Sequence, residues 1–563
     1  MARYAPLAPA EGDSARRVRL PASLRLRIAV VALVTIVVVA LVGAGHEDGR
    51  RAVLDGVQRA KSQVQGLWEP QREYQRPSKA ELRRIVGDTP RYLVKDGWAT
   101  YGFNNQRYML ESTLILARIA ERIPVLPDSI WARSCAVSDQ VCAEYALRTF
   151  EHRNEHEDVV GSRWNDEGPA YKLGIENFLD LAQLRRSYGP FLTISEFMDL
   201  YDIDPALYDE SLRWNTTNYA PAGLTTAVVP EGFFQNRTFI RVDRPPPSTP
   251  RYALSASESA EGLSTTLVNQ TLEARPAWTL QAAREALDKQ GAARPADDAA
   301  LVRRLEELGV VPLYTFSDEV LMNKALARPT VELAMPSRVS SLTTTLSSHP
   351  YADASIVYLA GNLHDQRKAG GLRFTTFSAR DDFVDLVLRG IRAPPRIREV
   401  GQRLAKRMSG RVNGRRWVAA HLRRGDFVNI AWSPAKDALV HFDKTKKALD
   451  RGVGVLKEHF DSRLPLGDDP FYLATDETNT TALAYYRSHG AILLSDLLIP
   501  ADTAALGWTS SYTDILAVVE QQVLAHADFF VGSELSSTSG GAINDRTALG
   551  KEDWSWSLLG RHD

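Results

Sequence analysis

Residues 421–427 read HLRRGDF and place an imidazole, two guanidinium groups and a carboxylate in one short run. The run overlaps the end of the apolar stretch 417–422, which predicts a buried strand. Ligands of parallel α/β sheets bind where strands end, so these side chains are expected at a binding edge. Arginine suits phosphate because its planar guanidinium donates hydrogen bonds in pairs and stays charged. The run therefore indicates an anion site, with an ordinary strand end carrying solvated arginines as the alternative.

Two further segments carry groups that could hold an anion. Residues 102–107, GFNNQR, place a glycine and two amides at a turn entering a predicted helix, and helix N-termini favour anions. Residues 532–541, GSELSSTSGG, follow a predicted strand and offer hydroxyls and backbone amides. They lack the pattern of a Walker loop, and a Ser-rich surface loop is the alternative interpretation.

The elements predicted around these segments alternate between strand and helix. Strands are expected at 417–422, 471–475, 491–494 and 529–532, with a helix at 514–526. In the first half, helical spacing of apolar residues predicts a helix at 109–122, and a short strand is expected at 123–127. Such alternation predicts parallel sheets covered by helices, of Rossmann type in the second half.

Composition narrows the class of protein. The 563 residues include 68 basic and 69 acidic side chains, so no chain-wide positive field is available for nucleic acid. The 2 cysteines, Cys135 and Cys142, exclude a four-thiolate zinc site. They could close a short disulfide loop in an oxidising compartment or stay as buried thiols. Glycosylation sequons agree with such a compartment, although sequons also arise by chance; they begin at Asn215, Asn236, Asn269 and Asn479.

Residues 28–45 form an uncharged apolar segment. At about 1.5 Å per residue, a helix of this length nearly matches a bilayer core of about 30 Å. Arginines gather before it, so the positive-inside rule places residues 1–27 in the cytosol and the body in the lumen. A cleaved signal peptide is the alternative, but its apolar core is normally shorter. We expect a single-pass type II protein of the Golgi or ER membrane, with a stem at 46–95.

The order and spacing of the motifs resemble the GDP-fucose protein O-fucosyltransferase superfamily. HLRRGDF is similar to the arginine motif that opens the nucleotide-binding half of those enzymes, and GFNNQR followed by IPVLPD is similar to their N-terminal loop. FYLATDET at 471–478 and FFVGSELSSTSGG at 529–541 resemble their strand end and diphosphate turn. Residues 175–200 resemble a stretch of fungal members. The matched pieces span about residues 100–550.

The resemblance implies a GT-B-like α/β fold in which two Rossmann-type domains face a cleft. The domains are expected at 96–375, with an exposed insertion near 241–298, and at 376–555. The implied reaction is inverting transfer of fucose from GDP-fucose to a protein or glycan hydroxyl. No cofactor or metal is expected, because a guanidinium and hydroxyls can stabilise a leaving diphosphate. The pair Asp202 and Asp204 is interpreted as surface acids. The alternatives are a non-catalytic lumenal binding protein and a glycosyltransferase that uses another sugar nucleotide.

The resemblance also implies roles for single residues. Arg423 is the expected catalytic residue, at the β-phosphate, whereas Arg424 is expected to point away from the donor. Asp476 is expected at the purine end. The other expected donor-binding residues are Gly102, Asn104, Asn105, His421, Ser537, Thr538 and Ser539.

One departure from the family concerns the general base. Some members carry a glutamate directly before the glycine of the N-terminal loop, where this chain has Tyr101. The base is therefore unassigned. Asn104 or Asn105 could merely orient the hydroxyl, Glu111 or another acid could act as the base, or the chain could bind nucleotide without catalysis.

Overall fold

A computed structural model describes residues 74–88, 90–95, 102–148, 169–204, 221–230 and 377–560, with isolated positions and short segments elsewhere between 160 and 374. The expected membrane segment, most of the expected insertion and the first three sequons lie outside the described residues. No helix within the described ranges is long and apolar enough to cross a membrane. All described residues belong to one unit, Tyr74–Asp563.

The first half contains a five-stranded sheet in which every neighbouring pair is parallel. Its order is β6 (Leu192–Thr193), β2 (Ile123–Leu126), β1 (Tyr92–Val94), β12 (Ile356–Leu359) and β7 (Thr226–Val229). The predicted strand at 123–127 is confirmed as β2.

The folded unit begins before residue 95, the expected end of the stem. The central strand β1 and the preceding helix α3 (Lys79–Val86) both belong to the folded unit. Leu82 of α3 and all three residues of β1 are fully buried, so they contribute to the core. The apolar run of β1 is too short to produce a recognisable period in a segment rich in charged residues.

The second half contains another five-stranded parallel sheet. Its order is β15 (Ala491–Ile492), β14 (Phe471–Thr475), β13 (Val418–Leu422), β16 (Phe529–Ser533) and β17 (Trp556–Leu559). Numbered along the chain, this order is 3-2-1-4-5, which is the Rossmann order. The strand order reverses between β13 and β16, which makes this the topological switch point of the sheet. Ligands of such sheets bind at the carboxyl ends of the strands beside this switch point.

The strands expected at 417–422, 471–475 and 529–532 are confirmed, but the one expected at 491–494 is shorter. Helix α18 (Leu494–Leu497) begins where the strand was expected to continue. The carboxylate of Asp496 accepts a hydrogen bond of 2.9 Å from the Leu493 N–H, which caps the helix. A local capping interaction therefore ends the extended segment early.

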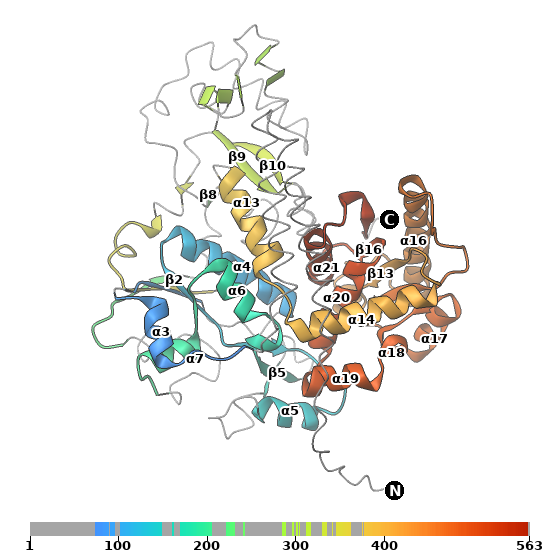
Figure 1. Ribbon diagram of the computed structural model, residues 1–563, viewed down its shortest axis with the longest axis horizontal. Helices are drawn as coiled ribbons and strands as arrows, with labels where there is room; N and C mark the ends of the chain where they lie inside the picture. The colour runs from blue at the N-terminus through green and yellow to red at the C-terminus, as the bar shows by residue number, and fades with distance from the viewer. Residues whose placement is uncertain are drawn as a thin grey trace, which may run out of the picture. The chain divides into compact units, whose positions relative to one another are not determined.

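Helices cover both faces of the second sheet (Figure 1). Alternate residues of a strand point to opposite faces. Val418, Ala420 and Leu422 of β13 pack in one apolar cluster with residues of α16 (Ala438–His459). Ala419 belongs to a second cluster, which includes residues of α14 (Pro395–Arg411) and α20 (Thr513–His526).

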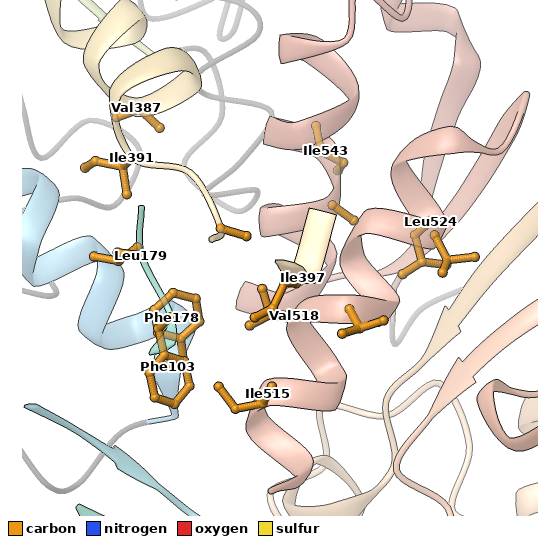
Figure 2. Close-up of a cluster of buried hydrophobic side chains, with 14 of the residues drawn as sticks. Phe103, Phe178, Leu179, Val387, Ile391, Ile397, Ile515, Val518, Leu524 and Ile543 are labelled. Carbon is orange, nitrogen blue, oxygen red and sulfur yellow. The ribbon is translucent and has the colours of Figure 1, made fainter. Parts of the chain in front are cut away.

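Helix α4 (Phe103–Ile119) begins at Phe103, well before the expected start at 109. Polar residues 104–106 hide the helical period in the sequence, but Phe103 is buried and stacks on Phe178 with ring centroids 4.8 Å apart. Figure 2 shows both rings in an apolar cluster with Ile515 of α20 and Ile543 of α21 (Ser537–Ala548). Packing thus holds the start of α4 against helices of the second half.

Cys135 and Cys142 are joined, which confirms the disulfide alternative. The bridged loop contacts the segment that leads into α20. The Ala136 N–H donates to Ser511 O over 2.7 Å, and Tyr512 donates its hydroxyl to Cys142 O over 2.6 Å. The disulfide loop therefore helps to fix the beginning of α20.

Candidate functional site

The carboxyl ends of β13 and β16 are tied together by Ser533. Its hydroxyl donates to His421 O over 2.8 Å and accepts from the Arg423 N–H over 3.0 Å. These two contacts fix the backbone on both sides of Leu422. The hydrogen bonds lie at the switch point of the sheet, where a ligand is expected.

Arg423 leaves β13 with its side chain between two carboxylates. Nη2 lies 2.6 Å from Asp426 Oδ1, and Nη1 lies 2.5 Å from Asp476 Oδ2. The other Asp476 oxygen accepts the Arg424 N–H over 2.6 Å. The Arg423 side chain is 26% exposed, so solvent reaches it. An arriving phosphate must therefore compete with carboxylates for this guanidinium.

Asp476 contacts the arginine motif itself, which differs from its expected position at the purine. The sequence resemblance places Asp476 at the purine and Arg423 at the β-phosphate, yet the two side chains form one ion pair. Gly425 packs against the same carboxylate: a Cβ there would lie 2.5 Å from Asp476 Oδ2, and its φ of +23° also disfavours other residues. Asp476 thus helps to position the arginine motif.

The Arg424 side chain is buried and has partners of its own. Its guanidinium donates to Ala435 O over 2.7 Å and to Lys436 O over 2.6 Å, and Nε pairs with Glu477 at 3.2 Å. These contacts hold the segment that follows the motif. The two guanidinium groups therefore have different partners.

His421 lies on the sheet face that carries Ala419, and its ring is buried. Its Nδ1 lies 2.8 Å from the hydroxyl of Ser539, which is also buried. Burial, assisted by the Arg423 charge, lowers the pKa of His421 to about 3. The imidazole is therefore neutral at physiological pH and serves as a hydrogen-bonding group.

The first turn of α21 carries the three expected hydroxyl residues. Ser537 and Thr538 are half-buried, whereas Ser539 is fully buried. The N-cap residue Ser536 makes no side-chain cap hydrogen bond to this turn. Amide groups at a helix start favour negative charge, so the turn suits an anion.

Asn104 brings the GFNNQR segment to this turn. Its Nδ2 lies 3.5 Å from Thr538 Oγ1, and its Oδ1 accepts from Gln521 Nε2 over 2.9 Å. Gln521 also donates to Thr538 O over 3.0 Å. Asn105 is half-buried, and its N–H donates to Gly102 O over 3.0 Å. The structure therefore joins two predicted segments through Gln521, which the sequence analysis missed.

Glu520 is a second residue that the sequence analysis missed. Its Oε1 accepts the Tyr472 hydroxyl over 3.1 Å. Burial raises its pKa to about 8, the Tyr472 hydrogen bond lowers it, and the charge of Asp476 raises it further. The signal was available in the sequence, since three consecutive polar residues, 520–522, interrupt an otherwise apolar helix.

We expect Glu520→Gln to stabilise the protein more at pH 8 than at pH 5. The folded-state pKa of about 8 lies above the usual 4.5, so the carboxyl prefers its protonated form in the folded state. The stability linked to that proton is complete at low pH and is lost as pH rises towards 8. Glutamine does not titrate. Melting temperatures across pH 5–9 should therefore diverge up to about pH 8, and parallel curves would contradict the assignment.

Three other acidic residues named in the sequence analysis either pair inside the core or lie at the surface. Glu111 is fully buried, and its Oε1 accepts Arg107 Nε over 3.0 Å. Because the Glu111 carboxylate is buried, an acceptor hydroxyl cannot reach it. Asp202 is largely exposed and pairs with Lys79, and Asp204 is exposed, as expected for surface acids.

The fold and the site define an α/β protein with parallel sheets and polar groups gathered at the switch point of the second sheet. No protein-family model matches the chain, and no curated protein matches it.

Solved structures similar to the chain include POFUT1 in complex with GDP-fucose, at 14% identity over 84% of this chain and 99% of that chain, with a TM-score of 0.34. POFUT1 in complex with GDP follows at 13% identity, with coverage of 84% and 99% and a TM-score of 0.35. NodZ alpha-1,6-fucosyltransferase soaked with GDP-fucose matches at 10% identity, with coverage of 80% and 91% and a TM-score of 0.30.

Proposed function

We propose that this chain is a GT-B-like glycosyltransferase that moves fucose from GDP-fucose to a hydroxyl of a protein or glycan. The observation that carries the proposal is the convergence of Arg423, the His421–Ser539 pair and the first turn of α21 at the switch point of the second sheet. Asn104 adds a group from the first half to the same turn. Together they supply one cation and several hydrogen-bond donors for a diphosphate.

The proposed mechanism stabilises the leaving group without a metal. When GDP leaves fucose, negative charge grows on the β-phosphate. Arg423 donates paired hydrogen bonds to it after exchanging at least one of its carboxylate partners, Asp426 or Asp476, for phosphate. The amides of the first turn of α21 add fixed positive potential. The neutral His421 ring and Ser539 hold this turn against β13.

We also propose that residues 28–45 anchor the protein in the Golgi or ER membrane as a single-pass type II protein with a lumenal body. The sequon residue Asn479 is exposed, which makes it accessible for glycosylation. Its side-chain oxygen caps α17 (Thr480–Ser488) by accepting from Thr481 N and Ala482 N. Glycosylation joins the amide nitrogen instead, so the cap is compatible with it.

Incubation of the full chain with GDP-fucose, GDP-mannose or a UDP-sugar tests the function. We expect GDP release from GDP-fucose alone, unchanged by EDTA, because Arg423 and the α21 turn take the place of a divalent ion. Binding without release would make the chain a non-catalytic lumenal binding protein. Release from another sugar nucleotide would assign a different donor.

A further inference from the structure

Gln521 of α20 contacts residues from both halves of the chain. Its side chain is buried. Its Nε2 donates to Thr538 O over 3.0 Å, in the first turn of α21, and to Asn104 Oδ1 over 2.9 Å, in the first turn of α4. A carboxamide nitrogen carries two hydrogens, so one Gln521 side chain can make both contacts. Three helices therefore meet at a single amide group.

The lack of a side chain at Gly541 of α21 leaves room for this amide group. A Cβ at Gly541 would lie 2.2 Å from Gln521 Nε2 and 2.9 Å from Asn104 Oδ1. A larger residue at this position would therefore displace Gln521. The two hydrogen bonds of Gln521 thus depend on a close approach of its side chain to the backbone of α21.

A backbone oxygen sets the direction of the hydrogen bonds in this cluster. Thr538 O can only accept, so the Gln521 atom that faces it must be the amide nitrogen. The same nitrogen faces Asn104, so the Asn104 atom at that contact must be its oxygen. The Asn104 nitrogen is left on the side of Thr538, 3.5 Å from Oγ1, at the long end of the hydrogen-bond range. The hydrogen bonds therefore run from Gln521 through Asn104 to the Thr538 hydroxyl.

The Thr538 hydroxyl is the end of this series that a ligand can reach. Thr538 is half-buried, whereas Gln521 and Asn104 are buried. A hydroxyl that accepts from Asn104 keeps its own hydrogen for another acceptor. Thr538 also lies in the first turn of α21, where backbone N–H groups have no acceptor within the helix. The hydroxyl hydrogen and these N–H groups can therefore serve the same anion.

We propose that Gln521 is a positioning residue for the diphosphate of the donor, an inference that rests on the proposed function. Gln521 fixes the amide of Asn104, and Asn104 then turns the Thr538 hydroxyl so that it donates to a phosphate oxygen. The second hydrogen bond of Gln521 holds the Thr538 backbone and so fixes the start of α21. Gln521 itself does not touch the donor, because its side chain is buried.

Equilibrium binding of GDP to the full chain tests this role. Gln521→Met keeps the length of the side chain but cannot donate, and Thr538→Val keeps its shape but lacks the hydroxyl. We expect each substitution to weaken GDP binding about 10-fold or more, the usual effect of losing one hydrogen bond to a charged group. Because both remove the same contact with phosphate, the double variant should bind about as weakly as the weaker single variant.

Gln522→Met is the matched control. Gln522 is the next residue of α20 and is also buried, but its amide donates to Asp545 and not to the first turn of α21. Its loss should lower the melting temperature and leave GDP affinity within about twofold of wild type. A purely structural role of Gln521 would give this same result for Gln521→Met.

Three results would overturn the positioning role. They are GDP affinity of Thr538→Val within about twofold of wild type, losses that multiply in the double variant, and an equal loss of affinity in Gln522→Met. The first of these does not depend on whether Gln521→Met folds. If wild-type protein binds no GDP, the proposed function itself fails. Wild-type binding of GDP with an unaffected Gln521→Met variant would refute only the role of Gln521.

Discussion

Arg423→Ala is expected to lower kcat/KM for GDP release from GDP-fucose by about 100-fold or more, the usual effect of losing one fixed donor to a developing anion. The substitution removes the guanidinium and leaves the carboxylates of Asp426 and Asp476 without their shared cation. GDP binding should weaken less than turnover, because the α21 turn remains. Lysine at 423 should rescue poorly, since a point charge cannot replace paired donors.

Arg424→Ala provides the matched comparison. Arg424 is buried and holds the backbone oxygens of Ala435 and Lys436, so its loss should lower the melting temperature. Among the protein that remains folded, turnover should fall much less than in Arg423→Ala. Near-normal turnover of a folded Arg423→Ala variant, or a larger catalytic loss at Arg424, would contradict the assignment of the leaving-group cation.

Arg546→Ala is expected to lower the free energy of unfolding by about 3 kcal/mol or more, because several buried oxygens, at about 1 to 3 kcal/mol each, lose their donor. Arg546 has no exposed surface. Its guanidinium donates to Leu524 O over 2.9 Å and Ala527 O over 2.7 Å, at the end of α20, and to Ser555 O over 2.9 Å. Burial lowers its pKa to about 9, so it stays charged at neutral pH. Alanine would leave these oxygens without the donor.

Urea denaturation of the full chain measures this effect. Arg487→Ala is the control, because Arg487 is 41% exposed and pairs with Asp496 at the surface. Such pairs contribute about 0 to 1 kcal/mol. A loss at Arg546 as small as that at Arg487 would show that other groups or water satisfy these oxygens.

Local patterns predicted much of the second sheet. The apolar runs of β13, β14 and β16 are distinct, and each is followed by polar residues at the binding edge. The first half was harder, because β1 is a short run and residues 104–106 disguise the first turn of α4. In both cases burial by distant segments overrides a weak local signal.

The site residues also divide into those that local patterns predict and those that only long-range packing brings together. The strand end at 422 indicated Arg423 and His421, and the family resemblance added Ser539; the structure joins His421 to Ser539. The sequence could not predict that Asp476 pairs with Arg423, or that Gln521 contacts Asn104, because both contacts join residues far apart in the chain. Such pairs depend on how helices pack, which periodicity does not encode.

Amide hydrogen exchange of the full chain, with and without GDP-fucose, tests the central claim most directly. We expect protection at residues 423–427 and at the first turn of α21, where the diphosphate would meet backbone amides. Protection should be weaker in Arg423→Ala at the same ligand concentration. Unchanged exchange in both segments at saturating GDP-fucose, or protection confined to the first sheet, would contradict a donor site at the switch point between β13 and β16.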